Sequence, residues 1–134
     1  MELKKTYKGF VVWLIAFCAA SILVCFLPIG DYILMIRLVC NICSLGVAVL
    51  AIIIYKTEYV YWYNGTSYEE AVEAGAARRK AFAWKHVKSF GTFALFFLVY
   101  SILSQCLHIH YMIDIIIFTG GILAAAFGTM RYQL

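Results

Sequence analysis

The sequence contains few charged residues, and this scarcity excludes an ordinary soluble globular protein. Only 13% of the 134 residues are Asp, Glu, Lys or Arg, whereas soluble domains carry about a quarter. Hydrophobic residues make up 65% of the chain, and the mean hydropathy is +0.89. At this length and composition we expect a single integral membrane domain over residues 1–134, with no separate soluble domain.

Motifs that commit a chain to common enzyme chemistry are lacking as well. The sequence has no P-loop, no G-x-S-x-G, no H-E-x-x-H and no dinucleotide fingerprint. We therefore expect no catalytic residues and no cofactor, and the sequence favours a protein that is not an enzyme. The formal net charge of +4 comes from residues that flank apolar stretches. Lipid headgroups would lie there, so the lipid bilayer, and not nucleic acid, is the expected partner.

Four long apolar stretches are present, at about residues 9–28, 32–55, 90–107 and 111–130. A bilayer core of about 30 Å needs about twenty helical residues, and each stretch meets that length with modest tilt. The alternating pattern of barrel strands is lacking. The first stretch is longer than a signal-peptide core and no A-x-A-like site follows it, so we expect it to be retained. The predicted fold class is an all-α membrane protein, a four-transmembrane-helix bundle.

Basic residues predict the orientation of the chain in the membrane. Ten of the eleven Lys and Arg residues lie before the first stretch, between the second and third, or after the fourth. The turns at 28–31 and 108–110 hold none. By the positive-inside rule, both termini and the loop 56–89 are expected in the cytoplasm, in what we predict to be a bacterial plasma membrane. Asn64-Gly65-Thr66 is a glycosylation sequon that this orientation would leave unmodified.

The loop 56–89 has the pattern of a surface helix. Ser67 and Glu70 fit a capping box, and acidic residues precede basic ones, as the helix dipole favours. We predict an amphipathic cytoplasmic helix over 68–89, with a bend at Gly75. Phe82, Trp84 and Val87 among its basic residues suit a membrane interface, and docking of a cytoplasmic or membrane protein is the alternative. His86, within this basic loop, is expected to be solvated.

Charged residues inside the apolar stretches are the sharpest chemical clue. Arg37 and Asp114 each lie about 6–9 Å below the outer boundary by helix rise, and they have opposite signs. Ionisable groups at that depth usually pair or face water, so we expect these two on facing helices within salt-bridge or water-bridged distance. Other polar residues of the second and third stretches lie at similar depth. Together they predict a polar pocket or ion path formed by Arg37, Asn41, Ser44, Ser101, Ser104, Gln105 and Asp114.

Small residues recur at helical spacing in the fourth stretch. They form two adjacent ladders, Gly120–Ala124–Gly128 and Gly121–Ala125. Such ladders let helix backbones approach closely, either within one chain or between copies. A bundle of four short helices leaves little room inside, so a solute path would arise more readily between copies. We expect a homo-oligomer on that reasoning.

Cys40 and Cys43 form a C-x-x-C motif, the spacing of dithiol redox sites, near the outer end of the second stretch. A four-helix chain with this motif resembles the quinone-linked disulfide-generating membrane proteins. That resemblance implies that Cys40 and Cys43 are the dithiol facing quinone. The family's second cysteine pair, in an extended outer loop, is absent here. Cys18 is expected to be a small apolar packing residue, and Cys25 and Cys106 lie in the same outer half as the motif.

His108, His110 and Asp114 form H-x-H-x3-D, and three such ligands could hold a zinc-like ion. A fourth ligand is not evident, and the alternative is an exposed turn with two solvated histidines.

Three hypotheses for function follow. The first is a small oligomeric channel or transporter with a polar outer vestibule around Arg37. The second is a non-catalytic membrane subunit or regulator that docks a partner through the 68–89 helix. The third is a membrane thiol–disulfide oxidoreductase that uses Cys40 and Cys43. The absence of an acid from the first stretch separates the chain from the small proton-coupled multidrug transporters, which it resembles in size.

Overall fold

The computed structural model describes residues 3–63 and 65–134, and within these ranges the regular structure is helical, with no strand. The helices are α1 (Lys8–Cys25), α2 (Tyr32–Thr57), α3 (Tyr68–Cys106) and α4 (Tyr111–Thr129), and a short 3-10 turn, η1 (Val60–Trp62), lies between α2 and α3. All four α-helices are long and apolar enough to cross a membrane. The predicted all-helical fold is therefore confirmed. Asn64, the acceptor of the sequon, lies outside the described residues.

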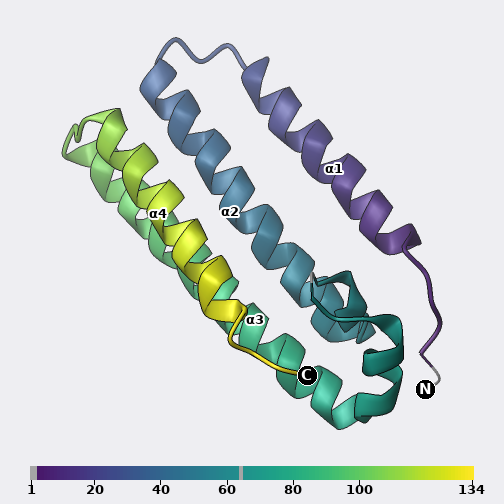
Figure 1. Cartoon of the computed structure of the whole chain (residues 1–134). Coiled ribbons are helices and arrows are strands. Elements are labelled where there is room, and N and C mark those ends of the chain that lie inside the picture. Colours follow the sequence, from purple (N-terminus) through teal and green to yellow (C-terminus); the bar gives the residue numbers. More distant parts are fainter. Residues whose placement is uncertain (1–2, 64) are drawn as a thin grey trace.

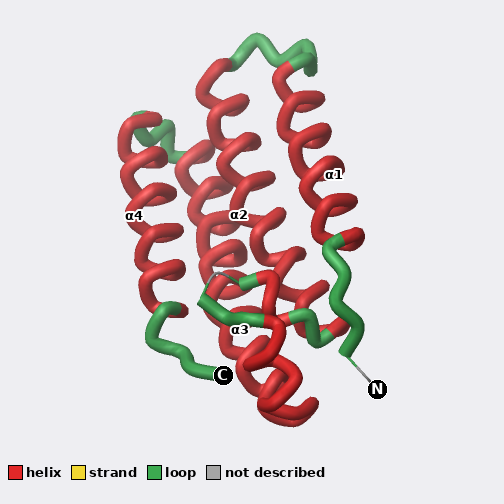
Figure 2. The backbone as a smooth tube through the Cα atoms, turned by 45° about the vertical axis from the view of Figure 1, so that its right-hand side comes forward, coloured by secondary structure: helices red, strands yellow, loops and turns green. Residues whose placement is uncertain are grey.

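The helices lie side by side, and α3 extends beyond the other three at one end of the molecule (Figure 1). Both termini and the connection between α2 and α3 lie at this end, which we call the terminal end (Figures 1 and 2). The two short turns, 26–31 and 107–110, lie at the opposite end. Helix α2 packs against each of the other helices, and α3 packs along α4.

Helix α1 ends at Cys25, three residues before the expected boundary. The amides of Phe26 and Leu27 donate to carbonyls three residues back, which tightens and closes the last turn. Pro28 cannot continue the helix, and it disfavours helical backbone at Leu27. Asp31 then caps α2, because its carboxylate accepts from the backbone amides of the next turn. These hydrogen bonds, that from the Leu34 amide foremost, lower the pKa of Asp31.

Helix α3 joins the predicted cytoplasmic helix and the third apolar stretch into one element. Its start has the predicted capping box: the Glu70 amide donates to Ser67 Oγ at 3.1 Å, and the Ser67 amide donates to Glu70 Oε2 at 2.7 Å. Gly75 has φ 75°, which is non-helical and suits a residue without Cβ. The predicted bend is therefore confirmed, and it separates the acidic first turns from the basic remainder.

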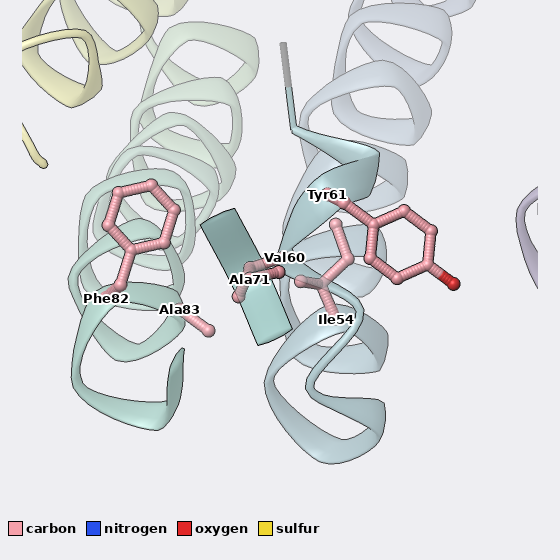
Figure 3. Packing of buried hydrophobic residues seen from close by; sticks show 6 residues of the cluster. All are labelled: Ile54, Val60, Tyr61, Ala71, Phe82 and Ala83. Atoms are coloured by element: carbon pink, nitrogen blue, oxygen red, sulfur yellow. The ribbon is translucent and has the colours of Figure 1, made fainter. Parts of the chain in front are cut away.

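A hydrophobic core lies at the terminal end. It is formed by the end of α2, by η1 and by the first half of α3, with the side chains of Ile54, Val60, Tyr61, Ala71, Phe82 and Ala83 (Figure 3). The N-terminal segment is tied to this core, since Tyr61 Oη donates to the Thr6 carbonyl and Trp62 Nε1 donates to the same oxygen. In contrast, none of the residues of α1, all of which are described, is fully buried. The end of α2, η1 and the first half of α3 thus form one folded unit.

Candidate functional site: a buried arginine–aspartate cluster

The cluster begins with one polar face of α2. Arg37, Asn41 and Ser44 follow at spacings of four and three, so they lie on one side of the helix. Their exposed fractions are 4%, 8% and 1%, which shows that this face points toward the other helices and not outward. An arginine with so little exposure needs partners for its charge and its donors.

Asp114 of α4 is the partner of opposite charge. Arg37 Nε donates to Asp114 Oδ2 at 2.9 Å, and the side chains are 4% and 1% exposed. The expected pairing of Arg37 with Asp114 on facing helices is therefore confirmed. It joins α2 to α4 across 77 residues of sequence.

The remaining guanidinium nitrogens are also bonded to protein groups. Arg37 Nη2 donates to Ser104 Oγ at 2.9 Å and to the Ile109 carbonyl at 2.7 Å, and Nη1 donates to Gln105 Oε1. Four of the five donors of a guanidinium thus have partners from α3, from α4 and from the turn between them.

The second carboxylate oxygen of Asp114 is bonded as well. Ser104 Oγ donates to Asp114 Oδ1 at 2.6 Å, and Tyr100 Oη donates to the same oxygen at 2.9 Å. Sequence reasoning missed Tyr100, although it precedes Ser104 by four residues and so shares its helical face. It also missed the Ile109 carbonyl, because a backbone group leaves no signal in the sequence.

A second group of hydrogen bonds lies further along α2, toward its C-terminal end. Asn41 Nδ2 donates to Ser101 Oγ of α3 and to the Arg37 carbonyl, both at 2.8 Å, and Ser44 Oγ donates to the Asn41 carbonyl at 3.0 Å. Asn41 Oδ1 is buried and has no hydrogen-bond partner among the described residues. All seven residues of the predicted polar pocket are therefore gathered at one place, and each has a side-chain hydrogen bond to another residue of the set.

The terminal end contains a second buried arginine. Arg79 is 5% exposed, and its Nη2 and Nε donate to Glu58 Oε2 at 2.8 and 3.2 Å. Arg79 Nη1 donates to the Ala71 carbonyl at 2.9 Å. Glu58 is the residue that ends α2, and its φ is 61°. The Arg79–Glu58 ion pair therefore holds the C-terminal end of α2 against the first part of α3. Sequence reasoning placed Arg79 only among the basic residues of the loop.

His86 is buried, which corrects the expectation that it is solvated. It is 4% exposed, its ring stacks on Tyr63 at 3.9 Å between centroids, and Nδ1 lies 3.1 Å from the Phe82 carbonyl. Burial lowers the pKa of His86, and it raises the pKa of Tyr63. A cavity of about 460 Å³ adjoins both rings, also lined by Phe90, Ala126 and Tyr132. The error arose because charge near His86 in sequence says nothing about which face of α3 it occupies.

The two small-residue ladders of α4 have different surroundings. A Cβ on Gly121 would collide with the ring of Phe93 in α3, and Ser89 Oγ donates to the Ala125 carbonyl at 3.4 Å. That ladder therefore packs within the chain. Gly120 and Ala124 are exposed, and a Cβ on Gly120 or Gly128 would meet nothing within 4 Å.

The cysteine motif lies on α2, where Cys40 and Cys43 are both free thiols of intermediate burial. Cys18, Cys25 and Cys106 are free and exposed. The part of the chain that the structure describes contains no disulfide, so the redox hypothesis gains no further geometric support.

The histidines do not join Asp114 in a metal site. Within residues 3–63 and 65–134, no group of three His, Cys, Asp or Glu side chains is placed to hold a metal ion. His108 and His110 are exposed, and His110 Nδ1 accepts from the Met112 amide as the cap of α4. Asp114 faces Arg37 instead.

Comparisons of the chain with protein-family models, with curated proteins and with solved structures find no match.

Proposed function

We propose that this chain is an integral membrane protein whose termini and 56–89 segment face the cytoplasm. The support is the coincidence of two features. The four helices have the length and hydropathy of membrane spans. The ten basic residues other than Arg37 belong to the N-terminal segment, the start of α1, the last turn of α2, the part of α3 up to Lys88 and the C-terminal segment. These parts lie at the same end of the molecule (Figure 1). Positive residues cluster on the cytoplasmic side of membrane proteins.

Within that membrane, we propose the role of a non-catalytic subunit or regulator that docks a partner protein through the cytoplasmic part of α3. One observation carries this proposal: the end of α2, η1 and the first part of α3 fold together around buried Arg79. Helix connections in bundles usually need only a few residues, whereas the segment 56–89 also includes the first part of α3. This segment, held by a buried ion pair and its own hydrophobic core, presents a fixed surface. The outward residues of α3 within it include Val72, Ala77 and Ala81.

The Arg37 cluster supports the same choice. A vestibule for ions or solutes needs polar atoms that face water. Here Asp114 and Ser104 are both 0% exposed and Arg37 is 4% exposed, and their polar atoms bond to protein groups. The cluster therefore has the features of a structural contact that holds α2, α3 and α4 together.

An oligomeric channel or transporter is the second candidate, and the outward Gly120–Ala124–Gly128 ladder favours it. Close contact between copies along this ladder would create an interface, and a path could run between protomers. This candidate needs flux from the purified protein alone, whereas the docking proposal does not.

Two measurements separate the candidates. Proteoliposomes with imposed H⁺, K⁺ or Na⁺ gradients should show no flux above protein-free liposomes. A photo-crosslinking amino acid at Ala77 or Ala81 in cells should give one discrete adduct, which a purified partner reproduces, whereas the same group at Ile116 of α4 should not. Transport would be established instead if three results coincide. The wild-type protein shows flux, the folded Arg37→Leu/Asp114→Leu double variant does not, and no crosslinked adduct forms at α3.

Orientation has its own test in a cysteine-free background. Ala77→Cys should resist a membrane-impermeant maleimide in intact cells and react after lysis. Gly30→Cys lies in the opposite turn, where an added Cβ meets nothing within 4 Å, and it should react in intact cells. The reverse pattern would overturn the proposed orientation.

A further inference from the structure

A groove lies between α3 and α4 on the outer surface of the molecule, close to the terminal end. Its volume is about 630 Å³, and it is shallow and opens broadly to the outside. Its lining is contributed by α3, by Ala125 of α4 and by Tyr132 of the C-terminal segment. This groove is separate from the Arg37 cluster.

The chemistry of the groove changes in order along α3. Lys88 comes first, the hydroxyl residues Ser89 and Thr92 follow, and the aromatic residues Phe93 and Phe96 come last. From Lys88 to Phe96 the helix advances by about 12 Å. Cation, then hydroxyls, then hydrocarbon is the order in which a phospholipid presents phosphate, glycerol ester and acyl chain. Phe96 is 57% exposed, so its ring has little cover from this chain, whereas Phe93 is 8% exposed and forms the packed floor of the groove.

The charge at the mouth of the groove is of one sign. Lys88 lines it, and Lys85 Nζ lies 5.5 Å from the ring centroid of Tyr132, which also lines it. No Asp or Glu is among the lining residues that the structure describes. Glu58 is engaged by Arg79 and Lys80, while Glu69, Glu70 and Glu73 lie beyond the Gly75 bend. Two cations with no lining acid favour an anionic occupant.

We propose that this groove is a binding site for one anionic phospholipid of the cytoplasmic leaflet. Lys88, assisted by Lys85, binds the phosphate, and an acyl chain lies against Phe93 and Phe96. The hydroxyl of Thr92 faces the glycerol region, beside Ser89, whose hydroxyl donates to the Ala125 carbonyl. Basic pockets between membrane helices on the cytoplasmic side are a known way of recognising acidic headgroups. The proposal rests on the proposed membrane insertion, but not on the partner-docking role.

The choice of a lipid over a soluble anion follows from the second half of the groove. A free phosphate would use only the lysines and would gain nothing from aromatic residues at the depth of the acyl chains. Each buried CH₂ of an acyl chain adds to binding, so headgroup and chain together should bind far better than either alone. A second copy of the chain could cover the aromatic residues only with an apolar helix face. Such a face carries no negative charge, so Lys85 and Lys88 would remain unpaired.

Lipid titration of the purified protein in detergent tests the site, read out by native mass spectrometry and by thermal stability. The probes are phosphatidylglycerol, phosphatidylcholine and water-soluble glycerol phosphate. We expect phosphatidylglycerol to bind with one preferred site, and the other two probes to bind at least tenfold more weakly. Lys88→Gln should weaken phosphatidylglycerol binding about fivefold, from the usual contribution of one lysine near a headgroup.

The matched control is Lys56→Gln. Lys56 is an exposed lysine in the last turn of α2, which contributes no described residue to the groove, and its loss should change affinity less than twofold. Phe96→Ala should weaken the binding of phosphatidylglycerol and leave the melting temperature of the lipid-free protein unchanged. This pair of measurements separates lost binding from lost folding.

Several results would overturn the proposal. Equal losses from Lys88→Gln and Lys56→Gln would show diffuse attraction between charges. Equal binding of glycerol phosphate would identify a free-anion site, and equal binding of phosphatidylcholine would remove the role of charge. If the wild-type protein forms dimers and Phe96→Ala abolishes them, the occupant of the groove is a second copy of the chain. A protein that purifies without detergent would instead refute membrane insertion itself.

Discussion

Arg37 Nε of α2 donates to Asp114 Oδ2 of α4 at 2.9 Å, and both side chains are almost fully buried. Removing one member leaves the other charge buried without its counterion, which costs about 3–5 kcal/mol in comparable pairs. We expect Arg37→Leu and Asp114→Leu each to lower thermal stability in detergent by that order. The double variant should recover part of the loss, because no unpaired charge remains.

Recovery should be incomplete, since Gln105 and Tyr100 also lose a partner in the double variant. Melting temperatures of the wild type, both single variants and the double variant form the required cycle. Equal melting temperatures for all three variants would contradict the coupling between Arg37 and Asp114.

Two adjacent arginines provide a matched pair at the terminal end. Arg79 is buried with Glu58, whereas Arg78 is exposed and donates to the Leu134 carbonyl at 2.7 Å. Arg79→Ala should cost about 3–5 kcal/mol, because it leaves Glu58 and the Ala71 carbonyl without this donor. Arg78→Ala should cost less than about 1 kcal/mol, as for exposed pairs.

Limited proteolysis with mass spectrometry checks this prediction. Cleavage between residues 58 and 75 should accelerate in Arg79→Ala and stay near the wild-type rate in Arg78→Ala. Equal rates in both variants would show that the buried pair of Arg79 and Glu58 does not hold the segment 58–89 together. That result would remove the main support for a fixed docking surface.

How much of this could be predicted depends on whether a residue's role is local or set by packing. Ser67 and Gly75 act on backbone within a few residues, so their capping and bending roles are legible in the sequence. Arg37 and Asp114 could be paired in advance because depth along a helix follows from residue count and buried charges need partners. Arg79 and His86 could not be placed, since their basic neighbours concealed which face of α3 turns toward the core.

His86 should make stability depend on pH. Burial lowers its pKa in the folded protein below the unfolded value of about 6.5, so the unfolded chain binds the proton more readily. The stability from neutral His86 is therefore complete above about pH 6.5 and is lost as the pH falls below that value. The groups that face it are Tyr63, Phe82 and Tyr132, and nearby Lys85 further disfavours the charged ring.

Melting temperatures at pH 7.5 and 5.5 test this linkage. His86→Phe should reduce the difference between the two pH values, whereas His110→Gln, at an exposed cap of α4, should leave it nearly unchanged. A difference that persists in His86→Phe would assign the pH dependence to other groups.

The last prediction concerns two neighbouring glycines of α4 that differ only in what they face. Gly121 packs against the Phe93 ring, so Gly121→Leu must displace that ring and should lower the melting temperature of the protein by several degrees. Gly120 faces open space, so Gly120→Leu should leave the melting temperature of the monomer unchanged. If copies assemble along the outward ladder, Gly120→Leu should lower the yield of crosslinked dimer in membranes, because a bulky side chain keeps the backbones apart. Crosslinking yield and melting temperature, measured on the same preparations, separate the two effects. An unchanged dimer yield in Gly120→Leu would exclude this ladder as the contact between copies, and with it the observation that favours a path between protomers.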